Sequence, residues 1–298
     1  MSRSTCKSLN CDPEEGVSMV PPANINKCVD GDACIKLEEL YVDSPEPIPV
    51  DTPDSTPYDT FRKLCAEALG TCILLTVIVG SGIMAETLSP TDVGLQLLEN
   101  AISVGLALVG LILIFGPVSG AHFNPIVSMI DCLHGDMSVV NGLLYTVAQV
   151  IGGICGTLLS NWQFDKAVEL STKARDESHL YVSEVVATMT LLLLIHGCLR
   201  SNQKEAIPFA VGGWVTSGHF FTSSTIFANP AVTIARQFTN TFTGIKPSSV
   251  APFIGCQVLG GLLSFGLIKF FYPKQMVMRK DDNLYLRCCI HHIKPKTD

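Results

Sequence analysis

Six long apolar runs divide this chain of 298 residues, and few charged side chains interrupt them. They predict helices at about 62–84, 97–117, 139–162, 180–199, 207–222 and 249–272. Because a helix rises about 1.5 Å per residue, about 20 apolar residues cross the ~30 Å hydrocarbon core of a bilayer. The pattern therefore predicts an all-α membrane protein with six transmembrane helices and both termini on one side.

Two further apolar segments lie in the second and fifth connections, and both contain the dipeptide Asn-Pro. One begins Asn124-Pro125-Ile126-Val127, and the other begins Asn229-Pro230-Ala231-Val232. Asn favours the N-cap of a helix and Pro its first turn, so each segment should open a short helix. A helix that starts in lipid leaves about four N–H donors unsatisfied, so these starts must face a polar cavity. We therefore predict two re-entrant half-helices, with Asn124 and Asn229 in a pore.

An internal repeat supports this arrangement. Glu67 and Glu184 lie in similar segments 117 positions apart, the two Asn-Pro motifs are 105 apart, and Gln149 and Gln257, each before a Gly-Gly pair, are 108 apart. Each half then holds three spans and one half-helix, and an odd number of spans places the halves in opposite orientations. We expect a channel domain at 61–272, with one repeat at 61–164 and the other at 179–272.

Composition agrees with a membrane protein, because 47% of the residues are hydrophobic and 16% are charged. Residues 1–60 are acidic and rich in proline, which predicts a disordered cytosolic tail, and residues 273–298 form a basic cytosolic tail. Lys and Arg gather on the side that we assign to the cytosol, with exceptions at Lys166, Lys173 and Arg175. No signal peptide is visible, and no basic stripe with interleaved aromatic residues suggests nucleic acid.

The twelve cysteines are scattered, so most should be reduced and buried. Those in the N-terminal tail lack zinc-site spacing. Cys288, Cys289, His291 and His292 form a cluster that would suit a thiophilic metal or a palmitoyl group, or that is simply part of a solvated tail. No cofactor, resident metal or enzyme chemistry is predicted.

The two Asn-Pro motifs, together with Ser119-Gly120-Ala121-His122-Phe123 and the segments around Glu67 and Glu184, resemble the aquaporin, or major intrinsic protein, family over residues 61–272. The run from Phe221 to Arg236 is similar to a bacterial subgroup found with arsenic-resistance genes. The resemblance implies six transmembrane helices plus two half-helices, a homotetramer in the lipid bilayer, and a plasma-membrane location.

The family also implies roles for single residues. Glu67 and Glu184 would hold the re-entrant loops, and His122 would either anchor its loop or switch charge near the cytosolic mouth. Counting from the Asn-Pro motifs places the outer filter at Val104, Ser217, Ile226 and Val232. Relatives usually carry an aromatic residue, a histidine and an arginine at three of these positions, so this filter should be wide and apolar. Arg236 would line the outer vestibule, and His219 would either reach the pore or pack within its helix.

Ile126 replaces the alanine that usually follows Asn-Pro, and we expect its larger branched side chain to narrow or reshape the midpoint. The leading interpretation is a passive channel for water or small neutral solutes such as glycerol, urea or undissociated arsenous acid. The alternative is an aquaporin-like scaffold with little conductance and a structural or adhesion role. An active transporter is disfavoured, since no ATP-binding motif or pair of intramembrane charges suited to ion coupling is present.

Overall fold

The computed structural model describes residues 27–28, 34–35 and 56–273. Strands β1 (Lys27–Cys28) and β2 (Cys34–Ile35) pair antiparallel within a compact unit of residues 1–48. The helices belong to the second unit, residues 49–298. Most of the expected N-terminal tail, and the C-terminal tail with Cys288, Cys289, His291 and His292, lie outside the described residues.

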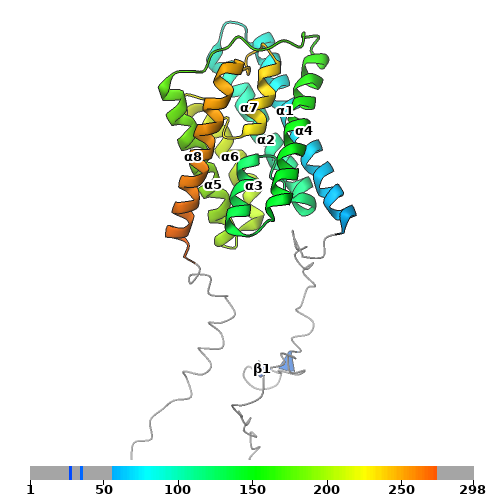
Figure 1. Ribbon diagram of the computed structural model, residues 1–298, viewed down its shortest axis with the longest axis vertical. Coiled ribbons are helices and arrows are strands. Elements are labelled where there is room, and N and C mark those ends of the chain that lie inside the picture. The colour runs from blue at the N-terminus through cyan, green and yellow to red at the C-terminus, as the bar shows by residue number, and fades with distance from the viewer. Residues whose placement is uncertain (1–26, 29–33, 36–55, 274–298) are drawn as a thin grey trace, which may run out of the picture. The chain divides into compact units, whose positions relative to one another are not determined.

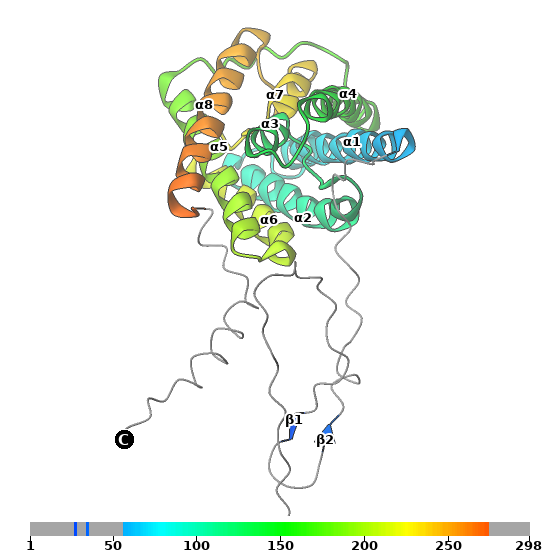
Figure 2. The ribbon, with the colours of Figure 1, turned by 60° about the horizontal axis from the view of Figure 1, so that its bottom comes forward.

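Residues 56–273 form a bundle of helices (Figure 1). The elements are α1 (Pro57–Leu88), α2 (Val93–Ser119), α3 (Pro125–His134), α4 (Val139–Gln163), α5 (Ser178–Arg200), η2 (Lys204–Ala206), α6 (Ile207–Phe221), α7 (Pro230–Ala235), η3 (Arg236–Phe238) and α8 (Pro247–Phe271). Figure 2 shows the short helices α3 and α7 beside α4 and α8, which both of them contact. We call the end where α1 begins and α8 stops the terminal end, and the opposite end the loop end.

Helix α1 starts earlier than the sequence pattern predicted. It begins at Pro57 instead of residue 62, inside the segment expected to be a disordered tail. Thr56 is the N-cap, its hydroxyl accepts a hydrogen bond from the Asp59 amide at 3.3 Å, and Pro57 occupies the first turn. The proline-rich composition concealed these capping signals, so the predicted tail boundary at residue 60 is wrong.

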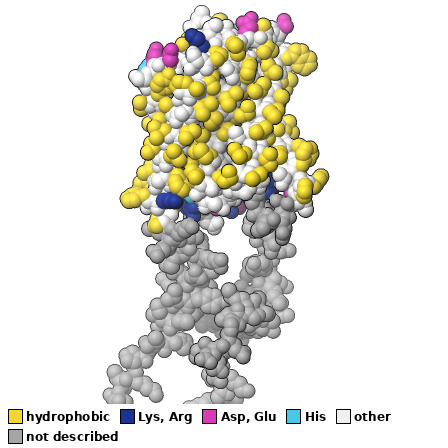
Figure 3. Space-filling model, viewed as in Figure 1, with side chains coloured by type: hydrophobic (Ala, Val, Ile, Leu, Met, Phe, Trp, Pro, Cys, Tyr) yellow, Lys and Arg dark blue, Asp and Glu magenta, His cyan; other side chains and the backbone are white. Residues whose placement is uncertain are grey.

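The surface of the bundle fits a membrane. Helices α1, α2, α4, α5 and α8 are long and apolar enough to cross a bilayer. Helix α6, which matches the fifth predicted span, has 15 residues and therefore a length of about 22 Å. On the face shown in Figure 3, hydrophobic side chains cover the middle and charged side chains gather at the two ends.

The repeat is visible in how the long helices pack. A Cβ atom placed on Gly152 of α4 would lie 2.1 Å from the Ala68 carbonyl oxygen of α1. In the second half, a Cβ atom on Gly260 of α8 would lie 2.6 Å from the Val185 carbonyl oxygen of α5. The two contacts stand at the sequence offsets of the repeat, so α1–α4 and α5–α8 are equivalent pairs of closely packed helices.

Candidate functional site

The two half-helices begin as their sequences predict. Asn124 caps α3, and its Oδ1 accepts a hydrogen bond from the Ile126 amide at 2.9 Å. Asn229 caps α7, and its Oδ1 accepts from the amides of Ala231 at 2.9 Å and Val232 at 3.3 Å. Pro125 and Pro230 occupy the first turns, where the missing N–H costs no helical hydrogen bond.

The two asparagines also join the half-helices to each other. Asn124 Nδ2 donates to the Ala228 carbonyl at 2.8 Å, and Asn229 Nδ2 donates to the Phe123 carbonyl at 2.7 Å. Each carboxamide nitrogen carries two hydrogens, so each keeps one after this bond. Both residues line the same cavity. Two N–H donors are therefore available where the two halves of the chain meet.

Glu67 organises the loop before α3. Its Oε1 accepts from the Ser119 hydroxyl at 2.6 Å and the His122 amide at 3.0 Å. Its Oε2 accepts from the Phe123 amide at 2.7 Å and from Gln149 Nε2 at 2.8 Å. A fully buried carboxylate with four donors is well satisfied, so Glu67 holds the loop backbone instead of facing the cavity.

Glu184 does the same in the second half. Its oxygens accept from the Phe227 amide at 3.0 Å, the Ala228 amide at 2.9 Å and Gln257 Nε2 at 2.7 Å. Both loops need such support, because Phe123 and Ala228 have left-handed backbones with φ of 48° and 46°. That conformation costs a non-glycine residue about 1–2 kcal/mol.

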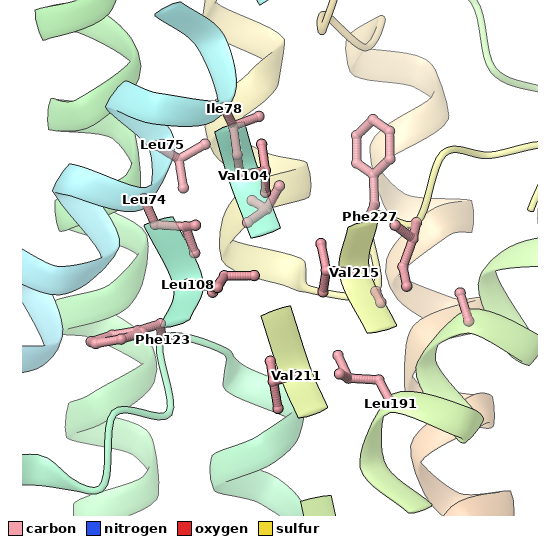
Figure 4. Packing of buried hydrophobic residues seen from close by; sticks show 14 of the residues in the cluster. Leu74, Leu75, Ile78, Val104, Leu108, Phe123, Leu191, Val211, Val215 and Phe227 are labelled. Atoms are coloured by element: carbon pink, nitrogen blue, oxygen red, sulfur yellow. The ribbon is translucent and has the colours of Figure 1, made fainter. Parts of the chain in front are cut away.

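A cavity of about 450 Å³ passes both asparagines and extends toward both ends of the bundle. In Figure 4 its apolar wall is formed by side chains that project toward one another from α1, α2, α5 and α6. These include Leu74, Ile78, Val104, Leu108, Leu191, Val211 and Val215. Much of the buried core of the bundle is thus also the wall of this cavity.

Charged and polar side chains mark the cavity near the terminal end, where Asp131, Asp136, Arg200 and Lys204 lie in its wall. His122 also lines it, with Nδ1 2.9 Å from the Ser128 hydroxyl and Nε2 3.1 Å from Asp131 Oδ2. Both ring nitrogens of His122 therefore contact side chains of α3, an arrangement that suits the anchoring role, one of the two considered from the sequence.

The expected outer filter is placed only in part. Val104, Ile226 and Val232 line the cavity, but Ser217 is exposed and does not. Val215 and His219, one turn apart on α6, line it instead. Ser217 is two residues from each, about 200° around the helix, so counting back from Asn229 across the intervening loop gave the wrong helix face.

Ile126 also differs from its predicted position. It is buried, and it packs away from the cavity with Ile130 and Leu192, while the next residue, Val127, lines the cavity. A Cβ atom on Gly261 of α8 would lie 2.7 Å from Ile126 Cγ2. The branched side chain fills the space above a glycine, so the expectation that it narrows the midpoint is wrong.

The loop end carries cations that the sequence analysis only partly identified. Arg236 lines the cavity, as expected for the vestibule. Arg175, from the connection between α4 and α5, is also buried and lies 4.7 Å from the Phe227 ring centroid, and it was not predicted as a site residue. The sequence did contain a signal for Arg175. It lies on the side assigned as outer, whereas most other Lys and Arg residues lie on the cytosolic side.

Among the described residues, no group of three or more His, Cys, Asp or Glu side chains could hold a metal ion. The polar features of the cavity are therefore the two carboxamides at its middle, the charges and His122 near the terminal end, and His219 with Arg236 at the loop end.

Comparisons with known proteins agree with this geometry. The family model of the major intrinsic proteins matches residues 54–226. Aquaglyceroporin AqpS of Rhizobium meliloti (strain 1021) is 41% identical over 225 residues, which cover 75% of this chain and 96% of that protein. The lens fiber major intrinsic protein of Bos taurus is 31% identical over 216 residues, covering 68% and 80%.

The fold also matches a solved structure. The X-ray structure of the aquaglyceroporin from Plasmodium falciparum superposes with a TM-score of 0.58 at 21% identity, covering 76% of this chain and 99% of that one. The inverted repeat, the paired half-helices and these likenesses lead to one conclusion. The chain is a multi-pass membrane protein that belongs to the major intrinsic protein, or aquaporin, family.

Proposed function

We propose that this protein is a passive channel for water and small uncharged solutes, with glycerol, urea and undissociated metalloid acids such as arsenous acid as candidates. The observation that carries the proposal is the cavity that runs past Asn124 and Asn229, each with a spare N–H donor. The relative AqpS is named an aquaglyceroporin, which favours polyols among the solutes.

Asn124 and Asn229 face the middle of the cavity, which we call the waist. This point binds one solute molecule at a time. A hydroxyl or water oxygen accepts from the two carboxamides, while the positive ends of α3 and α7 face the same point. A water molecule held this way turns its own hydrogens outward in both directions. The hydrogen-bonded wire that protons require is thereby interrupted, and cations are repelled, as in aquaporin-type channels generally.

The long apolar wall selects by size and by dehydration. The side chains of this wall offer no hydrogen bonds; among them are Leu74, Val104, Leu191 and Val211. A solute with many polar groups would leave them without hydrogen bonds here, which is costly. A flexible polyol or a neutral trihydroxy acid can turn its carbon or central atom toward this wall and its hydroxyls toward the backbone of residues 120–123 and 226–228, which also line the cavity. An ion cannot compensate for its lost hydration in this way.

The surroundings of the channel are proposed on similar grounds. Arg62, Lys63, Arg200 and Lys204 lie toward the terminal end, so we assign that end to the cytosol of a plasma-membrane protein, with both termini inside. A homotetramer is proposed from the family. Large apolar side chains exposed on the bundle, such as Leu106, Leu143 and Phe270, provide surface for neighbouring copies or for lipid.

The experiment is stopped-flow light scattering of proteoliposomes that contain purified full-length protein. We expect water, glycerol, urea and arsenous acid gradients to relax faster than in empty vesicles, and Asn229→Asp to change these rates by placing a carboxylate at the waist. If every rate equals that of empty vesicles, the channel proposal fails. If the Asn229→Asp variant matches wild type for every solute, the alternative of a poorly conducting scaffold gains support.

A further inference from the structure

Three cations converge on one short stretch of backbone at the loop end. Lys173 Nζ donates to the Phe242 carbonyl at 2.7 Å, Arg236 Nε donates to the Thr243 carbonyl, and Arg175 Nε donates to the Gly244 carbonyl at 3.1 Å. Three consecutive carbonyls of the loop before α8 thus each hold one cation. The cations come from two separate parts of the chain.

The arginines of this cluster are buried and form no salt bridge with a described residue, although the charge of Glu184 acts on both of them. Arg175 is 7% exposed and Arg236 is 6% exposed, and no carboxylate of residues 56–273 forms a salt bridge with either. Their guanidinium carbons lie 4.7 Å and 3.6 Å from the centroid of the Phe227 ring. Buried charge without a direct ion pair is costly in a membrane protein, and it marks functional positions more often than structural ones.

Only one member of the cluster lines the cavity, and that is Arg236. Its Nε is bound to the loop, but no described residue accepts a hydrogen bond from its two Nη groups. His219 lies on the same cavity wall, and its Nδ1 is 2.7 Å from the Val215 carbonyl. Since a carbonyl can only accept, the His219 Nδ1 carries a hydrogen and donates it to this carbonyl.

We propose that Arg236 is the specificity-determining residue at the loop end of this pore, where it admits neutral hydroxyl- or amide-bearing solutes and excludes cations. Phe227, Arg175 and Lys173 are positioning residues that hold its guanidinium and raise the local positive potential. The inference rests on the proposed channel function. The expected filter position, Val232, carries no charge, and Arg236, four residues later in the chain, supplies one there from the next helical turn.

A purely structural role makes a different prediction. If Arg236 only anchors the loop through Thr243, its loss should lower stability and alter all solutes alike, and a guanidinium elsewhere on the wall should not restore the wild-type behaviour. If Arg236 acts as a pore cation, its loss should favour charged solutes over neutral ones, and an arginine at position 232 should compensate.

The test uses two planar solutes of nearly equal size, neutral urea and cationic guanidinium, as radiolabelled probes at low concentration. Their uptake is measured into proteoliposomes whose membrane potential is held near zero. We compare wild type, Arg236→Leu, Arg236→Lys and the double variant Val232→Arg with Arg236→Leu. Arg62→Leu, an exposed arginine at the terminal end, is the matched control. Melting temperature and gel filtration identify variants that fail to fold.

Wild type and Arg62→Leu should exclude guanidinium. Arg236→Leu should raise guanidinium uptake at least about tenfold, since one charge a few ångströms away is worth that factor even when partly screened. Arg236→Lys and the double variant should return it toward the wild-type level. A folded Arg236→Leu variant with unchanged guanidinium uptake, or a double variant without rescue, would overturn the inference. Absence of any neutral flux in wild type would instead refute the channel proposal.

Discussion

At the scale of single residues, Ile126 should contribute to the stability of the protein but not to its permeability. It stands next to Asn124-Pro125 in the chain, yet it packs on Gly261 and Leu192 away from the cavity. Ile126→Ala should therefore cost about 2–5 kcal/mol of stability through the void it leaves. Glycerol permeability per folded molecule should stay at the wild-type value.

Thermal unfolding in detergent and liposome swelling measure these two effects. Val127→Ala is the comparison, because the Val127 side chain lines the cavity and its truncation should change permeability. Faster glycerol flux in Ile126→Ala with an unchanged melting temperature would place Ile126 back on the pore wall.

Lys173 gives the loop end a dependence on pH. Desolvation, then the charges of Arg175 and Arg236, lower the pKa of its ammonium to about 8 from an ordinary 10.5, and Glu86 acts weakly in the opposite direction. Between these values the unfolded chain binds more protons than the folded one, so the free energy of unfolding contributed by Lys173 rises with pH.

The measurement is the difference in melting temperature between wild type and Lys173→Gln at pH 7 and at pH 10. We expect this difference to shift in favour of wild type at the higher pH. Lys166→Gln, at an exposed lysine of the same connection, should show no such shift. A difference that stays constant, or that moves toward the variant, would contradict the assignment.

How far the sequence reaches depends on what fixes each residue. Asn124, Asn229, Glu67 and Glu184 could be found because local capping rules and the internal repeat identify them. The prediction that Ser217 lines the filter was wrong, because counting residues across a loop does not show which face of the next helix a residue occupies. The roles of Lys173 and Arg175 could not be assigned. These residues reach Phe242, Gly244 and Phe227 only through contacts between loop segments, which have no periodicity.

At the scale of helices, close backbone approach is the main structural device. Adding a methyl group at Gly152 or Gly260 drives a carbon into a backbone carbonyl of the partner helix, which cannot rotate away. Gly152→Ala and Gly260→Ala should each cost at least about 1–3 kcal/mol, as overpacking does. Thermal melting of the purified protein measures this loss.

Gly255→Ala and Gly266→Ala provide the controls within α8, because nothing lies within 4 Å of a Cβ atom at either position. They should leave stability unchanged or raise it by about 0.5–1 kcal/mol, since alanine is the better helix former. Equal losses at all four positions would mean that glycine conformation, and not helix contact, sets the effect. Gly255 and Gly260 lie on the same helix, yet only Gly260 meets a partner helix, so glycine content alone does not identify helix contacts.

Helices themselves were easier to predict than their ends. Apolar length fixes a span, because the bilayer requires it, and all six predicted spans are present as helices. The ends depend on capping groups, such as Thr56 before α1 and Asp92 before α2, which a hydrophobic pattern does not register.

At the scale of the whole molecule, the two halves are joined through Asn124 and Asn229. Each side chain donates to a carbonyl of the opposite loop, and those carbonyls belong to Phe123 and Ala228, whose strained backbones the glutamates hold. The contact between the two loops therefore depends on both asparagines, since each supplies one of its two hydrogen bonds. Removing one should weaken the bond made by the other, because the loop that carries the acceptor shifts.

A double-mutant cycle with Asn124→Ala and Asn229→Ala tests this coupling. Each single variant loses its own helix cap, a local effect that should add, and also disrupts the shared joint, which can be lost only once. The double variant should thus be less destabilised than the sum of the singles by about 0.5–3 kcal/mol, measured by unfolding in detergent. Strict additivity would mean that Glu67 and Glu184 hold the two loops independently, and that the halves of the repeat meet at the waist without stabilising each other.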